Sequence, residues 1–269
     1  MVSKSLLNLN KMKKFIIVAV LLISVITGCK SSKKTPTQEG VYKLEKQMLS
    51  GGGKDTIYAR TQVKIYTDKY FMYAALAPDS SVGFGVGSYK LDSVNKIVEN
   101  NIYSSRRLDS TINFKLDVTR TDTGYTQVIP DILRLRNVSY KMTEVYAKVA
   151  ATDTSALDGL WKMDATYSVT GKDTVKQTPT QYKIFKAGHF MFVHRYPIDK
   201  AGRKFKNGFG YGVFSLVNDT LREEDEISNH PQLLNRKFAI KITFKGKDEY
   251  SQVISDSTQK SIETYKRLK

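Results

Sequence analysis

The sequence predicts an all-β protein with two tandem, small antiparallel β-barrels that follow an N-terminal signal peptide. Three observations predict this: an internal repeat over most of the chain, hydrophobic residues at alternate positions, and short turn-forming segments between the alternating runs. The 269 residues suffice for one large domain or two small ones. The repeat places one domain at 38–150 and the other at 156–269, joined by a short polar link.

The first residues predict a secretion signal. A basic KMKK stretch precedes the apolar run FIIVAVLLISVITGC, which is too short to span a bilayer comfortably and ends at Cys29. Ile26-Thr27-Gly28-Cys29 resembles the lipobox of bacterial lipoproteins. The resemblance implies that residues 1–28 are removed as a signal peptide and that Cys29 is acylated, which would anchor the protein to a lipid bilayer.

Residues 29–37 would then be the lipidated cysteine and a polar tether. The expected localisation is the bacterial cell envelope, on a membrane that we expect to be the outer one. A secretory signal or an uncleaved anchor with an incidental cysteine is the alternative. Cys29 is the only cysteine, so no disulfide is possible, and after acylation no thiol remains for catalysis or metal binding.

The repeat consists of segments that match in order along the two halves. Gly40-Val41-Tyr42-Lys43 and Gly159-Leu160-Trp161-Lys162 are 119 residues apart, and the later matches keep an offset of 119 or 125. These matches are QVKIYTDKYFMYA with QYKIFKAGHFMFV, GFGVGSYKL with GFGYGVFSL, YTQVI with YSQVI, and Glu144 and Tyr146 with Glu263 and Tyr265. The changes of offset place one insertion at PIDKAGRKFKN in the second copy and another near PDILRLRNVSYK in the first.

Within each copy, apolar residues alternate with polar ones as in half-buried strands. Trp161, Met163, Ala165 and Tyr167 show this pattern, with a period of two. Turn-forming segments such as GGGKD, VTGKD and FKGKD separate the runs at the spacing of a meander. Seven to nine strands per copy, in about 110 residues, fit a small up-and-down barrel or a strongly curved sheet.

The segments GFGVGSYKL and GFGYGVFSL place glycine at every second position. Gly208, Gly210 and Gly212 would share one face of a strand, with Phe209 and Tyr211 on the other. The bare face could open a cavity for a ligand. It could also let the strand curve tightly around a bulky side chain from across the barrel, such as Trp161. We favour curvature, because both copies keep the glycines while the aromatic residues vary.

Gly159-Leu160-Trp161 looks like the GxW signature of lipocalins, and the first copy has Gly40-Val41-Tyr42 instead. Lipocalins tend to carry a late arginine that stacks on this tryptophan, and Arg267 is the matching residue. Lys148 would face Tyr42 in the first copy. The arrangement resembles the short lipocalin-like domains of bacterial envelope lipoproteins. The resemblance implies that a small, mainly apolar molecule binds in the barrel mouth without a catalytic step.

Aromatic residues of both copies and the insertion at 194–207 provide candidate ligand contacts. Core packing is the favoured role for the aromatic residues as a group, whereas the insertion would lie at the open end of a barrel. The candidates are Tyr73 and Phe84 in the first copy, and Phe192, His194, Arg195, Tyr196, Phe209 and Tyr211 in the second.

Other function classes find little support in the sequence. The net charge of +17 favours anionic partners, but the basic residues are scattered and no nucleic-acid recognition module is present. His189 and His194 would lie on opposite faces of one strand, so we expect no metal site, and no cofactor is expected. No GxSxG motif with a histidine base occurs, so we expect no enzyme activity. Glu144 and Glu263 are expected to form internal ion pairs.

Two function hypotheses follow. The first is a membrane-anchored lipoprotein that binds a small hydrophobic or amphipathic ligand, which requires an internal void of roughly 300 Å³ or more. The second is a non-enzymatic envelope interaction protein with filled barrels that binds a protein or glycan partner. It requires packed interiors and an exposed apolar or aromatic patch.

Overall fold

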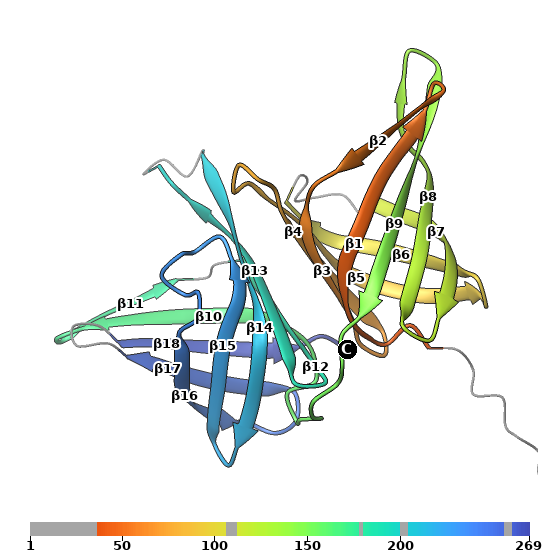
Figure 1. Ribbon diagram of the computed structural model, residues 1–269. Coiled ribbons are helices and arrows are strands. Elements are labelled where there is room, and N and C mark those ends of the chain that lie inside the picture. The colour runs from red at the N-terminus through yellow and green to blue at the C-terminus, as the bar shows by residue number, and fades with distance from the viewer. Residues whose placement is uncertain (1–36, 106–111, 178–179, 200–203, 256–259) are drawn as a thin grey trace, which may run out of the picture. The chain divides into compact units, whose positions relative to one another are not determined.

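The computed structural model describes residues 37–105, 112–177, 180–199, 204–255 and 260–269 (Figure 1). The expected signal peptide, the lipobox and Cys29 lie outside these residues. All named strands pair in antiparallel fashion and form two closed barrels, so the predicted fold class is confirmed. Within this part of the chain, no helix has the length and apolar character needed to cross a membrane.

The first barrel lies within the expected domain at 38–150. Its strands are β1 (Gly40–Gly51), β2 (Lys54–Tyr58), β3 (Thr61–Tyr66), β4 (Tyr70–Leu76), β5 (Val82–Ser93), β6 (Lys96–Ser104), β7 (Ile112–Thr121), β8 (Gly124–Leu135) and β9 (Val138–Lys148). β1 pairs with β9 along one edge and, along the other, first with β3 and then with β2. Eight strands therefore close the barrel, and β2 extends the line of β3.

The second barrel repeats this topology within the expected domain at 156–269. Its strands are β10 (Gly159–Thr170), β11 (Asp173–Gln177), β12 (Thr180–Lys186), β13 (His189–Pro197), β14 (Phe205–Val217), β15 (Thr220–Ser228), β16 (Lys237–Phe244), β17 (Glu249–Ser255) and β18 (Lys260–Arg267). β10 pairs with β18 to close the barrel, and β11 extends the line of β12.

Alternation explains the strands that have one face in solvent. In β16, Ile240 and Ile242 are buried, whereas Lys241 and Thr243 between and beside them are exposed. The tight turn between β1 and β2 uses Gly52 and its neighbour, whose φ angles of 59° and 75° lie in the left-handed region. Alternation and a glycine turn thus account for these elements at the level of local sequence.

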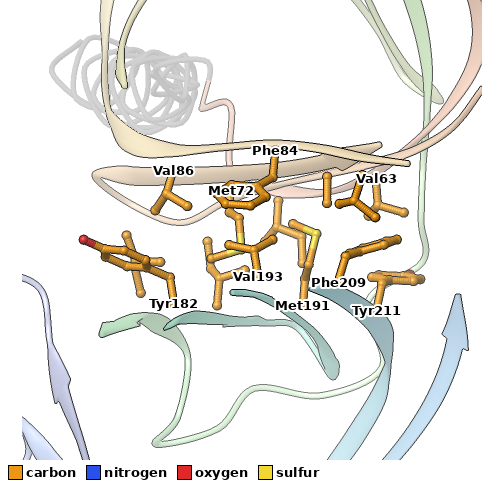
Figure 2. Close-up of a cluster of buried hydrophobic side chains, with 14 of the residues drawn as sticks. Val63, Met72, Phe84, Val86, Tyr182, Met191, Val193, Phe209 and Tyr211 are labelled. Atoms are coloured by element: carbon orange, nitrogen blue, oxygen red, sulfur yellow. The ribbon is translucent and has the colours of Figure 1, made fainter. Parts of the chain in front are cut away.

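β3, β4 and β5 depart from this pattern because both of their faces are buried. In β3, Lys64 and Tyr66 point into the first barrel, while Val63 and Ile65 point out and are nonetheless fully buried. The outer faces of β12, β13 and β14 cover them. Figure 2 shows this cluster, with Val63, Met72, Phe84 and Val86 facing Tyr182, Met191, Val193, Phe209 and Tyr211. An apolar core between the two barrels therefore joins them.

Polar contacts border this apolar core. Lys186 Nζ lies 2.6 Å from the carboxylate of Glu39, and Lys43 Nζ lies 3.0 Å from that of Glu226. The side-chain amide of Asn207 donates to a backbone carbonyl of the first barrel over 3.0 Å. In agreement with these contacts, Gln38–Lys269 forms a single compact unit.

Candidate functional site

The alternating glycines face the barrel interiors, and the space beside them is occupied. A Cβ at Gly85 would overlap the ring of Tyr73 on β4, and a Cβ at Gly210 would overlap the ring of Phe192 on β13. The ring that fills each space thus comes from the adjacent strand and not from Trp161 across the barrel. These glycines make room for the protein's own aromatic side chains.

Gly87 and Gly212 serve a second purpose. Each lies at a β-bulge, between Val86 and Gly87 in β5 and between Tyr211 and Gly212 in β14. A Cβ at either position would overlap a backbone carbonyl oxygen of the neighbouring strand. The two glycines therefore permit the close backbone approach that bends these strands, which agrees with the curvature interpretation.

The interior of the first barrel contains a buried ion pair. Lys64 Nζ lies 2.7 Å from the carboxylate of Glu99, and both side chains are at most 4% exposed. The Tyr66 hydroxyl also donates to Glu99, and Lys64 donates to the amide oxygen of Gln127 over 3.3 Å. Such a pair persists in a low-dielectric interior only because its polar atoms have partners.

A second buried carboxylate, Glu144, lies beside this pair. It accepts hydrogen bonds from the amides of Gln47, Gln62 and Gln127 over 2.6, 3.2 and 2.6 Å, and from the Tyr146 hydroxyl over 2.9 Å. Amide and phenol donors thus satisfy Glu144, where the sequence led us to expect an ion pair.

The second barrel contains the same kind of cluster. Lys183 Nζ lies 2.5 Å from the carboxylate of Glu223. Glu263 accepts from the Gln252 amide over 2.7 Å and from the Tyr265 hydroxyl over 2.8 Å, and not from Arg267. Burial raises the pKa of Glu263 above its ordinary value.

The two clusters occupy equivalent positions in the repeat. The equivalent pairs are Gln62 and Gln181, Lys64 and Lys183, Glu99 and Glu223, Gln127 and Gln252, Glu144 and Glu263, and Tyr146 and Tyr265. The sequence alignment of the two copies contained most of these pairs, but only Glu144 and Glu263 were expected to have an interior role. The repeated Gln-x-Lys at the same place in both copies was the signal that could have revealed the others. Each barrel interior is therefore filled by a hydrogen-bonded polar cluster that is packed among buried apolar and aromatic side chains.

One position distinguishes the clusters. Asp225 in the second barrel stands where the first has Asn101, and each side chain lies beside an interior glycine, Gly210 or Gly85. Burial, with a further contribution from the nearby Glu223, raises the pKa of Asp225 to about 7. Its Oδ1 atom has no hydrogen-bond partner. The second barrel therefore carries an extra acid that titrates near neutral pH.

Two histidines meet at the opening of the second barrel. His194 on β13 and His230, in the loop after β15, place their Nε2 atoms 3.1 Å apart. His194 Nδ1 lies 3.1 Å from the side-chain oxygen of Gln181. Burial, together with His230, lowers the pKa of His194 to about 4, and burial lowers that of His230 as well. Burial thus favours the neutral form of both rings.

The predicted ligand-contact residues fall into separate places. Phe84, Phe209 and Tyr211 lie in the core between the barrels, pointing away from the barrel interiors. Tyr73 lies inside the first barrel, and Arg195 stacks outside on Phe205, with its guanidinium 4.5 Å from the ring centre.

Three of the predicted residues do meet at one opening. The rings of Phe192 and Tyr196 lie 5.7 and 5.2 Å from that of His194. Sequence reasoning missed His230, because alternation within a strand says nothing about a residue contributed by a following loop.

The tryptophan signature closes the opposite end of the second barrel. The Arg267 guanidinium lies 4.1 Å from the centre of the Trp161 ring, and the indole nitrogen donates to the Leu157 carbonyl over 2.7 Å. In the first barrel the ring of Tyr42 instead packs edge-on against Tyr125, and Lys148 is exposed.

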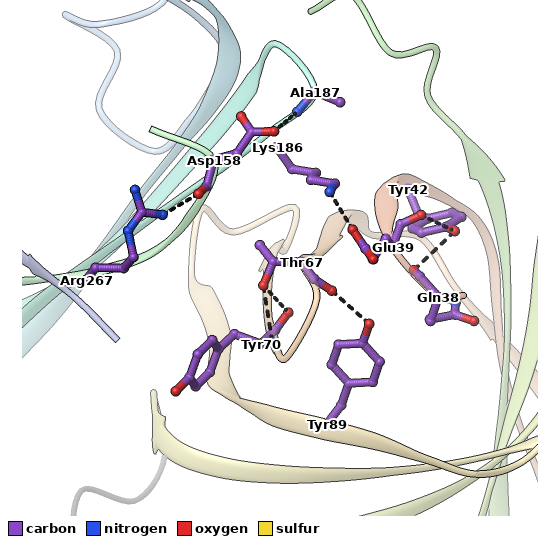
Figure 3. A network of polar contacts seen from close by, with 10 residues as sticks. All are labelled: Gln38, Glu39, Tyr42, Thr67, Tyr70, Tyr89, Asp158, Lys186, Ala187 and Arg267. Carbon is purple, nitrogen blue, oxygen red and sulfur yellow. Dashed lines mark hydrogen bonds and ion pairs between the residues drawn. The ribbon is translucent and has the colours of Figure 1, made fainter. Parts of the chain in front are cut away.

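A polar pocket of about 540 Å³ lies near this end and is bordered by both barrels. Figure 3 shows the ion pair between Lys186 and Glu39 and the hydrogen bond from Arg267 to the Asp158 carbonyl, both on its wall. Asp68, Asp158, Lys247 and Asp248 also line it. Charged groups thus dominate this pocket, which does not suit an apolar ligand. In the described part of the chain, no three histidine, cysteine or acidic side chains converge as metal ligands.

Comparison with known proteins adds little to this picture. No protein-family model matches the sequence, and no curated protein matches it. A structural match is the crystal structure of a protein of unknown function from the DUF3598 family of Nostoc punctiforme, which is 9% identical. The match covers 86% of this chain and 96% of that chain, with a TM-score of 0.27. A similarity this low supports no argument about family or function.

Proposed function

We propose that this chain is a lipid-anchored protein of the bacterial cell envelope that binds a protein partner without catalysing a reaction. The occupied barrel interiors carry the proposal. Lys64, Glu99 and Glu144 in the first barrel, with their counterparts in the second, take the place where a lipocalin-like protein would hold an apolar ligand. Partner binding then falls to the outside of the barrels.

The strands that extend beyond the first barrel offer a suitable surface. The hairpin between β8 and β9 and the end of the β1–β2 hairpin project together from the rest of the barrel (Figure 1). Gln47 and Glu144 are paired and point into the barrel. Leu49 and Met142 are paired two positions further along the same strands, so they lie on the same face, which continues onto the projection. The projection therefore has one face that is apolar.

We call this the extended face. It consists of Leu49, Tyr58, Leu133, Leu135, Tyr140 and Met142. Tyr58, Leu133 and Leu135 are 44%, 41% and 51% exposed, and Leu133 and Leu135 are neighbours on this face of β8. Leu133 and Leu135 belong to the insertion that only the first copy contains. Apolar side chains favour a protein partner over a glycan.

A small ligand at the opening of the second barrel is a second candidate function. The rings of Phe192, His194 and Tyr196 gather there, next to the amide of Gln181. The imidazole of His194 and the amide of Gln181 are polar, so this cluster favours a polar ligand over the mainly apolar one that the lipocalin resemblance implies.

Site-specific photo-crosslinking in intact cells tests the main proposal. A benzophenone amino acid would replace Tyr58 or Leu135 on the extended face, with Val94 and Val217, which are 64% and 50% exposed at other turns, as matched controls. We expect one covalent protein adduct of defined mass from the first two positions and none from the controls. No adduct, or the same adducts from all four positions, would contradict the proposal.

A further inference from the structure

We propose that His194 and His230 form a binding site for a divalent transition-metal ion at the opening of the second barrel. The inference is independent of the partner proposed for the first barrel. It rests on the positions of the two imidazoles, on the groups that orient them, and on the space that Gly208 leaves for them.

The separation of the two nitrogens suits a shared ion. Two imidazole nitrogens bound to one tetrahedral zinc ion, each about 2.0–2.1 Å from it, lie about 3.3 Å apart. His194 Nε2 and His230 Nε2 are already 3.1 Å apart. The ring centres lie 5.1 Å apart and the ring planes are inclined by 63°, so the rings are not stacked on one another. Binding therefore requires only a small opening of the pair.

Hydrogen bonds fix the tautomer of His194. The Tyr265 hydroxyl donates its proton to Glu263, so it must accept a hydrogen bond from the Gln181 NH₂ group, 2.6 Å away. The oxygen of that amide then faces His194 Nδ1 and accepts a hydrogen bond from the Nδ1–H group. His194 Nε2 is left with a free lone pair directed at His230. An acceptor behind the second ring nitrogen is the usual support of a metal-binding histidine.

The loop that carries His230 is fixed to β14. The Asn229 side chain accepts from the Phe209 backbone N–H over 2.9 Å and donates to the Asn207 carbonyl over 3.0 Å. Ser228 Oγ donates to the Phe209 carbonyl over 2.7 Å. These bonds lie on both sides of Gly208 and hold His230 next to it.

Gly208 supplies the space. A Cβ at this position would overlap His194 Nε2 and lie 2.5 Å from His230 Nε2. The first barrel has no such pair, because Ala75 stands at the position equivalent to His194. The site therefore belongs to the second barrel alone.

The donor set indicates the class of ion. Neutral imidazoles bind Cu²⁺, Ni²⁺ and Zn²⁺, whereas Mg²⁺ and Ca²⁺ prefer oxygen ligands. On binding, the His230 proton moves from Nε2 to Nδ1 and both Nε2 lone pairs turn to the ion, so no proton is released. Two protein ligands leave positions for water, so the ion can exchange.

Calorimetric titration of the metal-free full chain with ZnCl₂, NiCl₂ or CuCl₂ tests this site. The chain is kept in detergent micelles and carries Cys29→Ser, so that no thiol can bind the ion. We expect one ion per chain, and we expect His194→Gln and His230→Gln each to abolish this binding. His189→Gln, which removes a histidine buried elsewhere, is the matched control and should retain it. His230 lies in a half-exposed loop, so its variant should fold, which circular dichroism can verify.

The supporting amide has its own test. Gln181→Leu should keep the ratio of one ion per chain and weaken binding by about 10- to 100-fold, the usual cost of removing an outer hydrogen-bond partner. The proposal is wrong if the chain binds none of the three ions at millimolar concentration, or if the His194→Gln and His230→Gln variants still bind one ion as tightly as the wild type.

Discussion

Lys64 Nζ lies 2.7 Å from Glu99 inside the first barrel, almost fully shielded from water. The pair recurs in the second barrel, where Lys183 lies 2.5 Å from Glu223. Because a buried charge without a partner is costly, each residue of such a pair depends on the other. The repeat thus preserves a buried ion pair in the interior of each barrel.

The first prediction concerns this ion pair. Lys64→Met should lower the free energy of unfolding by about 3–5 kcal/mol, because it leaves Glu99 buried without its counter-charge. Urea unfolding followed by circular dichroism measures the effect. The double variant Lys64→Met/Glu99→Gln should recover part of the loss, since a neutral amide still accepts from Tyr66. A single variant as stable as the wild type would show that the pair is not buried as described.

The second prediction compares two glycines of one strand. Gly87→Ala should destabilise the protein by about 1–3 kcal/mol or more, because its Cβ would overlap a backbone carbonyl that cannot move aside. Gly83→Ala is the matched control, since its Cβ would lie 3.9 Å from the hydroxyl of Ser105. Thermal melting should separate the two variants clearly. Equal melting temperatures would argue against the bulge at Gly87.

The third prediction concerns pH. The folded-state pKa of Asp225 is about 7, above the unfolded value of about 3.9. Between these values the folded chain binds more protons than the unfolded chain, so the contribution of Asp225 to the free energy of unfolding falls as pH rises from about 4 to about 7. Asp225→Asn, which places there the residue of the first barrel, should remove that contribution. Urea titrations at several pH values test this, and identical pH profiles for both proteins would contradict it.

The fourth prediction concerns the closed end of the second barrel. Trp161 is fully buried, and Arg267 lies over its ring. Trp161→Ala should destabilise the protein by about 3–5 kcal/mol through the loss of this packing. A melting temperature equal to that of the wild type would show that Trp161 does not stabilise the core.

The fifth prediction concerns the anchor. Cys29→Ala should leave the protein soluble or as an unprocessed precursor, because no acyl chain can be attached. Membrane fractionation with and without the substitution decides this. Unchanged anchoring and processing of the variant would contradict the lipoprotein assignment.

Sequence patterns were enough to predict the two barrels, because strand formation and repetition leave direct traces in the chain. The alternation in β16 and the constant offset between Gly40 and Gly159 are examples. Alternation also correctly placed the glycines of β14 on one face of the strand and Phe209 and Tyr211 on the other. It could not tell which face turns inward, since the other barrel covers the outer apolar face of β14.

The buried polar residues of β3 and β12 inside the barrels were hard to predict because the other barrel covers the outer face of these strands. Lys64 stands between Val63 and Ile65, and in isolation this pattern suggests a solvated lysine on an ordinary strand. In the structure the second barrel covers Val63 and Ile65 on the outer face of β3. Lys64 therefore points into the first barrel and not into solvent. The pairing of His194 with His230 depends on how a loop folds back onto β14, and neither periodicity nor spacing encodes that.

Native mass spectrometry of the full chain, purified from membranes in mild detergent, tests most directly whether the barrels are filled. We expect the mass of the acylated chain, with at most one metal ion added. We expect no organic molecule bound in a fixed ratio. A discrete organic adduct that persists in the wild type and disappears on Phe192→Ala would contradict filled barrels and show that the interior of the second barrel is a ligand site.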